Sequence, residues 1–159
     1  MNRVSGSVIS CLLITGITLN VNAANLAEPN ANVSLSYYSL QHNNTITKSC
    51  QCGLYGLNSP VLYAQGFVGV PVSPNPQACN ENTHFSITTE PWIALIERGN
   101  CTFSEKILVA AKKGAAAVVI YNAPTNNGNQ TIPMVHYGRE SIGGQQTTLS
   151  CVSIKCVHR

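Results

Sequence analysis

The fold is decided by residues 91–122, which read PWIALIERGNCTFSEKILVAAKKGAAAVVIYN. The run from Trp92 to Glu97 is apolar almost throughout and has the length of a strand, which is typical of a strand covered on both faces. Residues 115–121 have the same character and predict a second buried strand. A helix between two such strands predicts a βαβ crossover unit with parallel strands.

The segment between the two predicted strands carries the signals of a helix. Thr102 and Glu105 form a capping box, in which the Thr hydroxyl accepts from the Glu105 N–H and the Glu carboxylate accepts from the Thr102 N–H. Gly114 is the expected C-terminal stop. One helical face is apolar or small, and the charged residues Glu105, Lys106, Lys112 and Lys113 are expected mostly off it.

The rest of the chain predicts a β-rich domain with less regular elements. Residues 33–40 alternate as a half-buried strand, residues 43–59 resemble a loop, and residues 61–70 predict one irregular strand. Prolines forbid regular structure over residues 71–77. Residues 126–129 predict a turn, residues 131–135 a short edge segment, and from about residue 141 the sequence has no period of a helix or a strand.

Composition removes several kinds of chemistry. Of the 159 residues 44% are hydrophobic and only 9% are charged, and all six acidic residues are Glu. Without Asp, the chain has no aspartate dyad, no EF-hand loop and no Ser-His-Asp triad. The net charge of +3 comes without a basic cluster beyond Lys112 and Lys113, which argues against a nucleic-acid partner.

The N-terminus predicts entry into the secretory pathway. Residues 1–23 combine one positive charge, an apolar stretch from Val8 to Leu19 and small residues before a cleavage site after Ala23, as in a signal peptide. The stretch is shorter than a bilayer span, so we expect a mature chain without a membrane anchor. Cleavage would leave six of the seven cysteines, an even number that suits an oxidising compartment. N-glycosylation acceptors are present at Asn32, Asn43, Asn100 and Asn129.

Catalytic and metal-binding motifs are not found in the sequence. The four His residues outside the predicted signal peptide lie in no His-Glu-x-x-His motif, and neither a Gly-x-Ser-x-Gly elbow nor a phosphate-binding loop is present. Spacing alone leaves a Cys-His pair open. Zinc is disfavoured by the tight Cys50 to Cys52 spacing and by a lone half-site at Cys151, Cys156 and His158. We therefore expect no cofactor and no metal.

Two of the six cysteines bracket the first buried strand. A disulfide between Cys79 and Cys101 would tie the loop before that strand to the start of the helix, and would stabilise the fold by about 3 kcal/mol through loop closure. A bridge between Cys50 and Cys52 is sterically awkward. Their partners are either Cys151 and Cys156 or cysteines of another molecule.

Several motifs, in order and spacing, resemble a protease-associated (PA) domain. More narrowly, the chain is similar to the luminal PA domain of membrane-bound RING-finger ubiquitin ligases of the goliath/GRAIL type. The resemblance covers roughly residues 33–138. It is carried by residues 91–107, 110–111, 113–115 and 117–122, by Ala78-Cys79-Asn80, by residues 53–60 and by residues 131–134.

The resemblance implies a β-rich α/β fold in which the βαβ unit packs on a small barrel-like sheet, with Cys79 and Cys101 at the positions of the family disulfide. It implies a non-catalytic module that binds or recruits protein partners in the secretory or endosomal lumen or at the cell surface. In the family, a further strand, helix and strand precede a transmembrane helix and the RING. Residues 139–159 match none of these elements.

The predicted organisation is a signal peptide over residues 1–23, a PA domain over residues 24–140 that lacks its C-terminal closing elements, and a divergent tail over residues 141–159. Two alternatives to the partner-binding module stay open. The first is a truncated form of a transmembrane RING E3 ubiquitin-protein ligase that competes for its substrates. The second is a small secreted thiol or hydrolytic enzyme.

Overall fold

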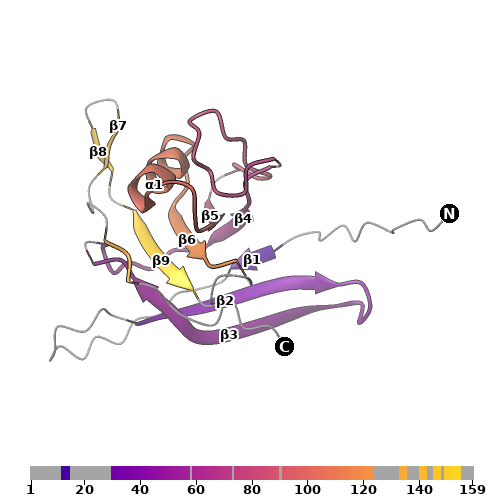
Figure 1. Cartoon of the computed structure of the whole chain (residues 1–159). Helices are drawn as coiled ribbons and strands as arrows, with labels where there is room; N and C mark the ends of the chain where they lie inside the picture. The colour runs from indigo at the N-terminus through magenta and orange to yellow at the C-terminus, as the bar shows by residue number, and fades with distance from the viewer. Residues whose placement is uncertain are drawn as a thin grey trace, which may run out of the picture.

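The structure is a computed structural model of the chain, and it describes residues 12–14, 30–57, 59–72, 74–89, 91–123, 133–135, 140–142, 145–147 and 149–154. Seven strands form a closed barrel in the order β1-β2-β3-β9-β6-β5-β4, and the helix α1 lies against one side of it (Figure 1). The strands β4, β5, β6 and β9 run parallel to one another, whereas β1, β2 and β3 join the barrel through antiparallel pairs. This β-rich fold with one short helix confirms the predicted fold class.

The crossover unit lies where the sequence predicts it. Strand β5 (Trp92–Glu97) leads into α1 (Phe103–Lys112), and β6 (Ala117–Tyr121) then pairs with β5 in parallel. Thr102 is the N-cap and both hydrogen bonds of the predicted capping box are present. Gly114 follows the helix with φ +83°, a left-handed conformation that glycine adopts at no steric cost.

Alternate residues of β5 and β6 contribute to two different hydrophobic clusters. Trp92, Ala94 and Ile96 pack in one cluster with the apolar side chains of α1, together with Val118 and Ile120 of β6. Ile93, Ala117 and Val119 belong to a second cluster with Val68 of β4. Both faces of these strands are therefore covered, which explains their continuously apolar sequence.

The first half of the barrel is a long hairpin, and the prediction for these residues was partly wrong. Strand β2 (Asn30–Ser39) begins before the predicted residue 33, and β3 (Asn44–Tyr55) occupies most of the segment expected to be a loop. Most side chains of β3 up to residue 51 are exposed, so its sequence lacks apolar alternation. Pairing with β2 holds it extended, and this pairing includes side-chain hydrogen bonds between Ser36 and Thr47 (2.8 Å) and between Ser34 and Ser49 (2.7 Å).

Of the irregular strand predicted over residues 61–70, only β4 (Gly66–Gly69) is a strand in the structure. Residues 61–65, which precede it, are irregular. A Cβ atom on Gly66 would lie 2.5 Å from the Pro91 carbonyl oxygen, so glycine permits the close approach of this strand to the start of β5. The proline-rich segment that follows is irregular as predicted, with a single bridge between Pro71 and Phe85.

The C-terminal residues form strands, although no period of a helix or a strand was found from about residue 141. Strand β9 (Ser150–Ile154) lies between β3 and β6 and completes the barrel, and β7 (Glu140–Ile142) forms a short hairpin with β8 (Gln145–Thr147). The sequence Ser-Cys-Val-Ser-Ile gives a weak strand signal because small and polar residues occupy buried positions, including Ser153 at 5% exposure. Tertiary packing rather than local propensity decides this strand.

Two further predictions lie near this region. The turn over residues 126–129 and the first two residues of the edge segment lie outside the described residues, whereas Pro133–Val135 is irregular rather than a strand. Met134 is fully buried and its carbonyl accepts a hydrogen bond from Leu57 N (2.8 Å). Within the described residues, no helix is both long and apolar enough to cross a membrane.

Candidate protein-interaction site

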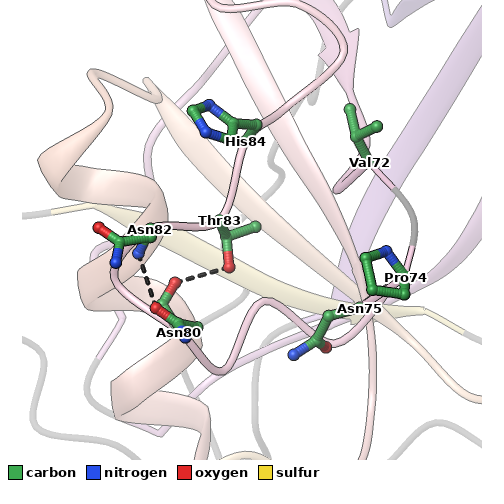
Figure 2. A pocket seen from close by; sticks show the side chains of 7 residues that line it. All are labelled: Val72, Pro74, Asn75, Asn80, Asn82, Thr83 and His84. Carbon is green, nitrogen blue, oxygen red and sulfur yellow. Dashed lines mark hydrogen bonds between the residues drawn. The ribbon is translucent and has the colours of Figure 1, made fainter.

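The connection between β4 and β5 contains a pocket of about 350 Å³. Its lining, drawn in Figure 2, is formed by Val72, Pro74, Asn75, Asn80, Asn82, Thr83 and His84. Pro71, Pro74 and Pro76 keep this connection out of regular structure. The connection lies beside α1 (Figure 1).

Hydrogen bonds within the connection fix the shape of the pocket. Asn80 accepts at its side-chain oxygen from Asn82 N (2.8 Å) and at its carbonyl from the Thr83 hydroxyl (2.6 Å), as the dashed lines in Figure 2 mark. The opposite wall is tied by Val72 N, which donates to the His84 carbonyl at 2.9 Å. A pocket held in this way is preorganised, so a ligand loses less free energy in ordering it.

The side chains that line the pocket are neutral amides, a hydroxyl, an imidazole and aliphatic groups. Glu81, which stands between Asn80 and Asn82 in the sequence, forms a surface ion pair with Lys112 (2.7 Å). The hydrogen bond from the Lys112 ammonium lowers the pKa of the Glu81 carboxyl. Amide side chains donate and accept hydrogen bonds at once. The pocket is therefore suited to a neutral polar ligand, such as the backbone amides of a peptide, rather than to an ion.

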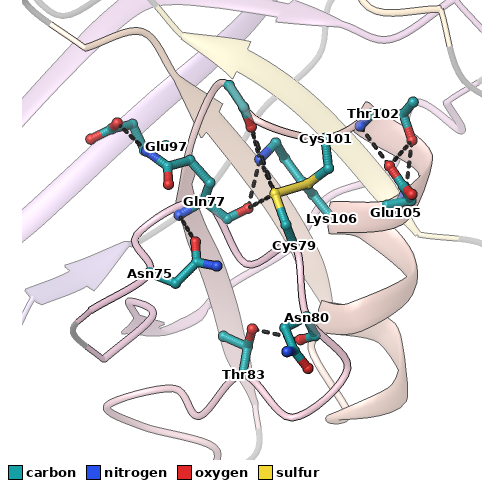
Figure 3. Close-up of a disulfide and its surroundings, with 11 residues drawn as sticks. Asn75, Gln77, Cys79, Asn80, Thr83, Glu97, Cys101, Thr102, Glu105 and Lys106 are labelled. Carbon is teal, nitrogen blue, oxygen red and sulfur yellow. Dashed lines mark hydrogen bonds between the residues drawn. A yellow bond between two sulfur atoms is a disulfide. The ribbon is translucent and has the colours of Figure 1, made fainter.

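A disulfide joins the connection to the turn that precedes α1. Cys79 and Cys101 form the disulfide drawn in Figure 3. Their S–S distance is 2.04 Å and their Cα–Cα distance is 5.7 Å. Beside the bridge, the Gln77 side-chain amide donates to Glu97 at the end of β5 (2.7 Å), and Glu97 N donates to the Pro76 carbonyl (3.1 Å). The pocket is therefore held by a covalent link to the turn before α1 and by hydrogen bonds to β5.

Lys106 also holds the connection in place, and this role was not predicted from the sequence. We expected this residue mostly off the apolar face, yet it is 0% exposed, and its ammonium donates to the carbonyls of Gln77 (2.6 Å) and Gly99 (2.7 Å) (Figure 3). Burial lowers its pKa to about 8, against the opposing influence of Glu97 and Glu105. The spacing could have indicated this, because position 106 stands three residues after Phe103 and four before Ala110 on the buried stripe.

The second pair of cysteines behaves differently from the expectation. Cys50 and Cys52, two residues apart in β3, are bridged to each other, so Cys151 is not the partner of either. Cys151 is a fully buried thiol in β9, and Cys156 lies outside the described residues.

Three of the four predicted glycosylation acceptors lie at exposed positions. Asn32 is on β2, Asn43 is in the hairpin turn with φ +50°, and Asn100 is in the turn after β5 with φ +69°. The Asn43 side chain accepts a hydrogen bond from the Tyr38 hydroxyl. Asn129 lies outside the described residues.

The described part of the chain contains no group of three or more His, Cys, Asp or Glu side chains able to hold a metal ion. Ser39 and His42 are hydrogen-bonded (3.0 Å), but Ser39 is the last residue of β2 and His42 lies in the exposed hairpin turn that follows, where Ser39 also accepts from His42 N. This contact stabilises a turn.

Comparison with known proteins identifies the class of the fold and then its relatives. The PA domain profile matches residues 60–147, more than half of the 159 residues, and the chain therefore belongs to the PA domain family. It is 48% identical over 99 residues to RING finger protein 148 of Bos taurus, covering 61% of this chain and 32% of that protein. It is 38% identical over 139 residues to E3 ubiquitin-protein ligase RNF149 of Mus musculus, covering 84% of this chain and 35% of that protein.

A third relative, E3 ubiquitin-protein ligase RNF133 of Homo sapiens, is 42% identical over 102 residues, covering 63% of this chain and 27% of that protein. The resemblance to the PA domain of RING-type ligases is thus confirmed. The chain spans about a third of the length of these curated relatives.

Proposed function

We propose that this PA domain binds protein partners in the secretory or endosomal lumen or at the cell surface, and that it is not itself catalytic. The observation that carries the proposal is the preorganised, neutral pocket in the β4–β5 connection, held by the Cys79–Cys101 bridge and by Lys106. The family membership of the chain supports the same function.

The surroundings of the pocket suit a protein ligand. Val70 is 40% exposed and Val72 is 51% exposed, so apolar surface borders the amide-lined pocket. Protein interfaces combine apolar contacts at their centre with hydrogen bonds to backbone and side-chain groups. A peptide segment that buries the two valines while its amides meet Asn75, Asn80 or Asn82 would satisfy both requirements.

Site-specific photo-crosslinking tests this proposal. A photoreactive amino acid is placed at the exposed His84 or, as a matched control, at the exposed Thr45 of β3, and the protein is expressed in secretory cells. Discrete crosslinked partners at position 84 that fall at least tenfold with Asn82→Arg are expected. Equal crosslinking at both positions, or crosslinks at position 84 that Asn82→Arg leaves unchanged, would contradict the proposal.

We also propose that residues 1–23 are removed during secretion, that Asn32, Asn43, Asn100 and Asn129 are glycan acceptors, and that Cys79 and Cys101 are oxidised in the mature protein. The exposure of the first three acceptors supports their glycosylation, and the pairing of Cys79 with Cys101 in the structure supports their oxidation. Intact mass of the secreted protein, before and after reduction and deglycosylation, measures all of them together. A mass that retains residues 1–23, or one that neither treatment changes, would contradict them.

A second candidate function is favoured by the fraction of its relatives' length that the chain spans. Because the chain spans about a third of proteins named as E3 ubiquitin-protein ligases, we propose that its PA domain captures partners for such a ligase or competes with one for them. Transcripts of the same locus that encode a transmembrane segment and a RING are expected. A locus that lacks both coding segments would exclude this candidate.

A further inference from the structure

Strand β1 (Leu12–Ile14) fills a position between two strands that are far apart in the sequence. It pairs antiparallel with β2, where Leu12 and Leu13 stand opposite Tyr37 and Ser36, and antiparallel with β4, where Leu13 and Ile14 stand opposite Phe67 and Gly66. Figure 1 shows β1 as the indigo arrow between β2 and β4. We call the space between Ser36–Tyr37 of β2 and Gly66–Phe67 of β4 the β1 slot.

The β1 slot is occupied by residues that the mature protein is expected to lose. Leu12–Ile14 lies inside the proposed signal peptide, and cleavage after Ala23 would remove this strand while β2 and β4 stay in place. The secreted domain would then have an open position in an otherwise closed barrel.

The backbone around the β1 slot calls for an extended occupant. Phe67 N donates to the Pro91 carbonyl at 3.0 Å, on the side of β5. Because alternate residues of a strand direct their N–H groups to opposite neighbours, Gly66 and Val68 direct theirs toward β1. Both residues are buried while β1 is in place, and removal of β1 would take away the strand that pairs with these amides.

The chemistry of the occupant follows from the residues in the slot. Leu-Leu-Ile is uncharged and aliphatic, and the four residues that it pairs with are serine, tyrosine, glycine and phenylalanine. A charged side chain would find no opposite charge among these four. A strand of aliphatic residues satisfies the backbone groups and remains compatible with this neutral site.

We propose that the mature domain binds an extended, uncharged aliphatic segment of a protein partner by β-strand addition in the β1 slot, antiparallel to both β2 and β4. This inference rests on the proposed partner-binding function and names the kind of segment that is recognised. It assigns a second contact to the partner, apart from the pocket in the β4–β5 connection.

The experiment uses the protein that cells secrete from the complete 159-residue precursor, with its N-terminus determined by mass. The probe is a synthetic peptide of residues 9–17 with Cys11→Ser, and the matched control is the same peptide with Leu13→Pro, which cannot donate from its central backbone nitrogen. Binding is followed by fluorescence anisotropy, and amide hydrogen exchange locates it.

Saturable binding of the probe, at least tenfold weaker binding of the proline peptide, and at least tenfold slower exchange at Gly66 and Val68 are expected. The proposal is overturned if the probe does not saturate or protects other strands. It is equally overturned if these amides are already slow without peptide, because another segment or a second copy then fills the slot, or if the secreted protein retains β1.

The two proposals fail in different ways. If the peptide result is negative while crosslinking from position 84 persists, the β1 slot is wrong and the partner-binding function stands. If the probe binds as expected and no partner crosslinks from position 84, the slot stands and the proposed function of the pocket fails.

Discussion

The crossover unit and the β2–β3 hairpin belong to one barrel but are held by different forces. In β5 four of six residues are buried, whereas in β3 only three of twelve are buried, and all three lie near its end at Cys52, Gly53 and Tyr55. The crossover unit is stabilised by the removal of apolar surface from water on both faces. The hairpin is stabilised mainly by its backbone ladder and by hydroxyl pairs such as Ser36 with Thr47.

Because of this difference, we expect the crossover unit to be sensitive to substitution and the exposed part of the β2–β3 hairpin to tolerate it. The pocket and the Cys79–Cys101 bridge are both attached to the crossover unit, so substitutions there should affect stability and partner binding together. The exposed part of the hairpin carries the acceptor Asn43 at its turn. Matched substitutions in the two regions can test whether the distinction is real.

The largest effect is expected from Trp92→Ala. Trp92 is fully buried and its ring centroid lies 5.0 Å from that of Phe85, so truncation removes a large apolar surface and leaves a cavity beneath α1. The expected loss is about 3–5 kcal/mol of unfolding free energy, measured by urea denaturation. The matched control is Tyr38→Ala, because Tyr38 is 45% exposed in the hairpin, and its loss should stay below about 1 kcal/mol. Equal losses would contradict the distinction between the regions.

A second comparison removes one disulfide from each region. Cys79→Ser with Cys101→Ser opens a loop closed across a sequence separation of 22, and should cost about 3 kcal/mol. Cys50→Ser with Cys52→Ser opens a loop with a separation of only 2, for which the same chain-entropy relation gives about 1.6 kcal/mol. Urea midpoints of both double variants check the order. A larger loss from the hairpin pair would overturn it.

The third prediction concerns Lys106 and pH. Lys106→Met keeps the length of the side chain but leaves the carbonyls of Gln77 and Gly99 without their donor, which should cost about 1–2 kcal/mol at pH 7. The pKa of Lys106 is lowered from 10.5 to about 8 in the fold, so between these values the unfolded chain binds more protons. Stability from this group therefore rises as pH increases from about 8 to 10.5.

The Lys106→Met variant has no titrating group at this position, so it is the control for the wild-type protein. The difference in unfolding free energy between the wild-type protein and Lys106→Met should widen from pH 7 to pH 10, because other groups titrate alike in both. A difference that stays constant or narrows over this range would show that Lys106 is not desolvated in the folded protein.

The same comparison explains what the sequence could predict. The crossover unit was predicted nearly residue by residue, because its signals are local: the apolar runs, the capping box and Gly114 all act within a few positions. β3 and β9 were missed since their extended conformation depends on partners that are distant in the chain, β2 for the first and β6 for the second.

The candidate site was predicted only where its residues form local or covalent links. Cys79 and Cys101 could be paired from their positions around one strand, whereas the pocket depends on how Asn80 folds back on Asn82 and Thr83. The burial of Lys106 depends on Gln77 and Gly99, whose carbonyls reach it only in the folded domain. The helical pattern of the sequence does not predict which backbone carbonyls will accept hydrogen bonds from the buried Lys106 ammonium.

The smallest effect sharpens the comparison with one threonine from each region. Thr102→Ala removes the N-cap hydroxyl, which accepts a hydrogen bond from Glu105 N at 3.2 Å. The Thr102 N–H donates to the Glu105 carboxylate at 2.7 Å, and this hydrogen bond lowers the pKa of Glu105. The expected loss is about 1 kcal/mol. Thr47→Ala removes a hydroxyl pair on an exposed strand and should cost about 0.5 kcal/mol or less. Urea denaturation of both variants, with Thr45→Ala as a background control, decides the order. If Thr47→Ala costs more than Thr102→Ala, the hairpin contributes to the stability of the barrel as strongly as the crossover unit does.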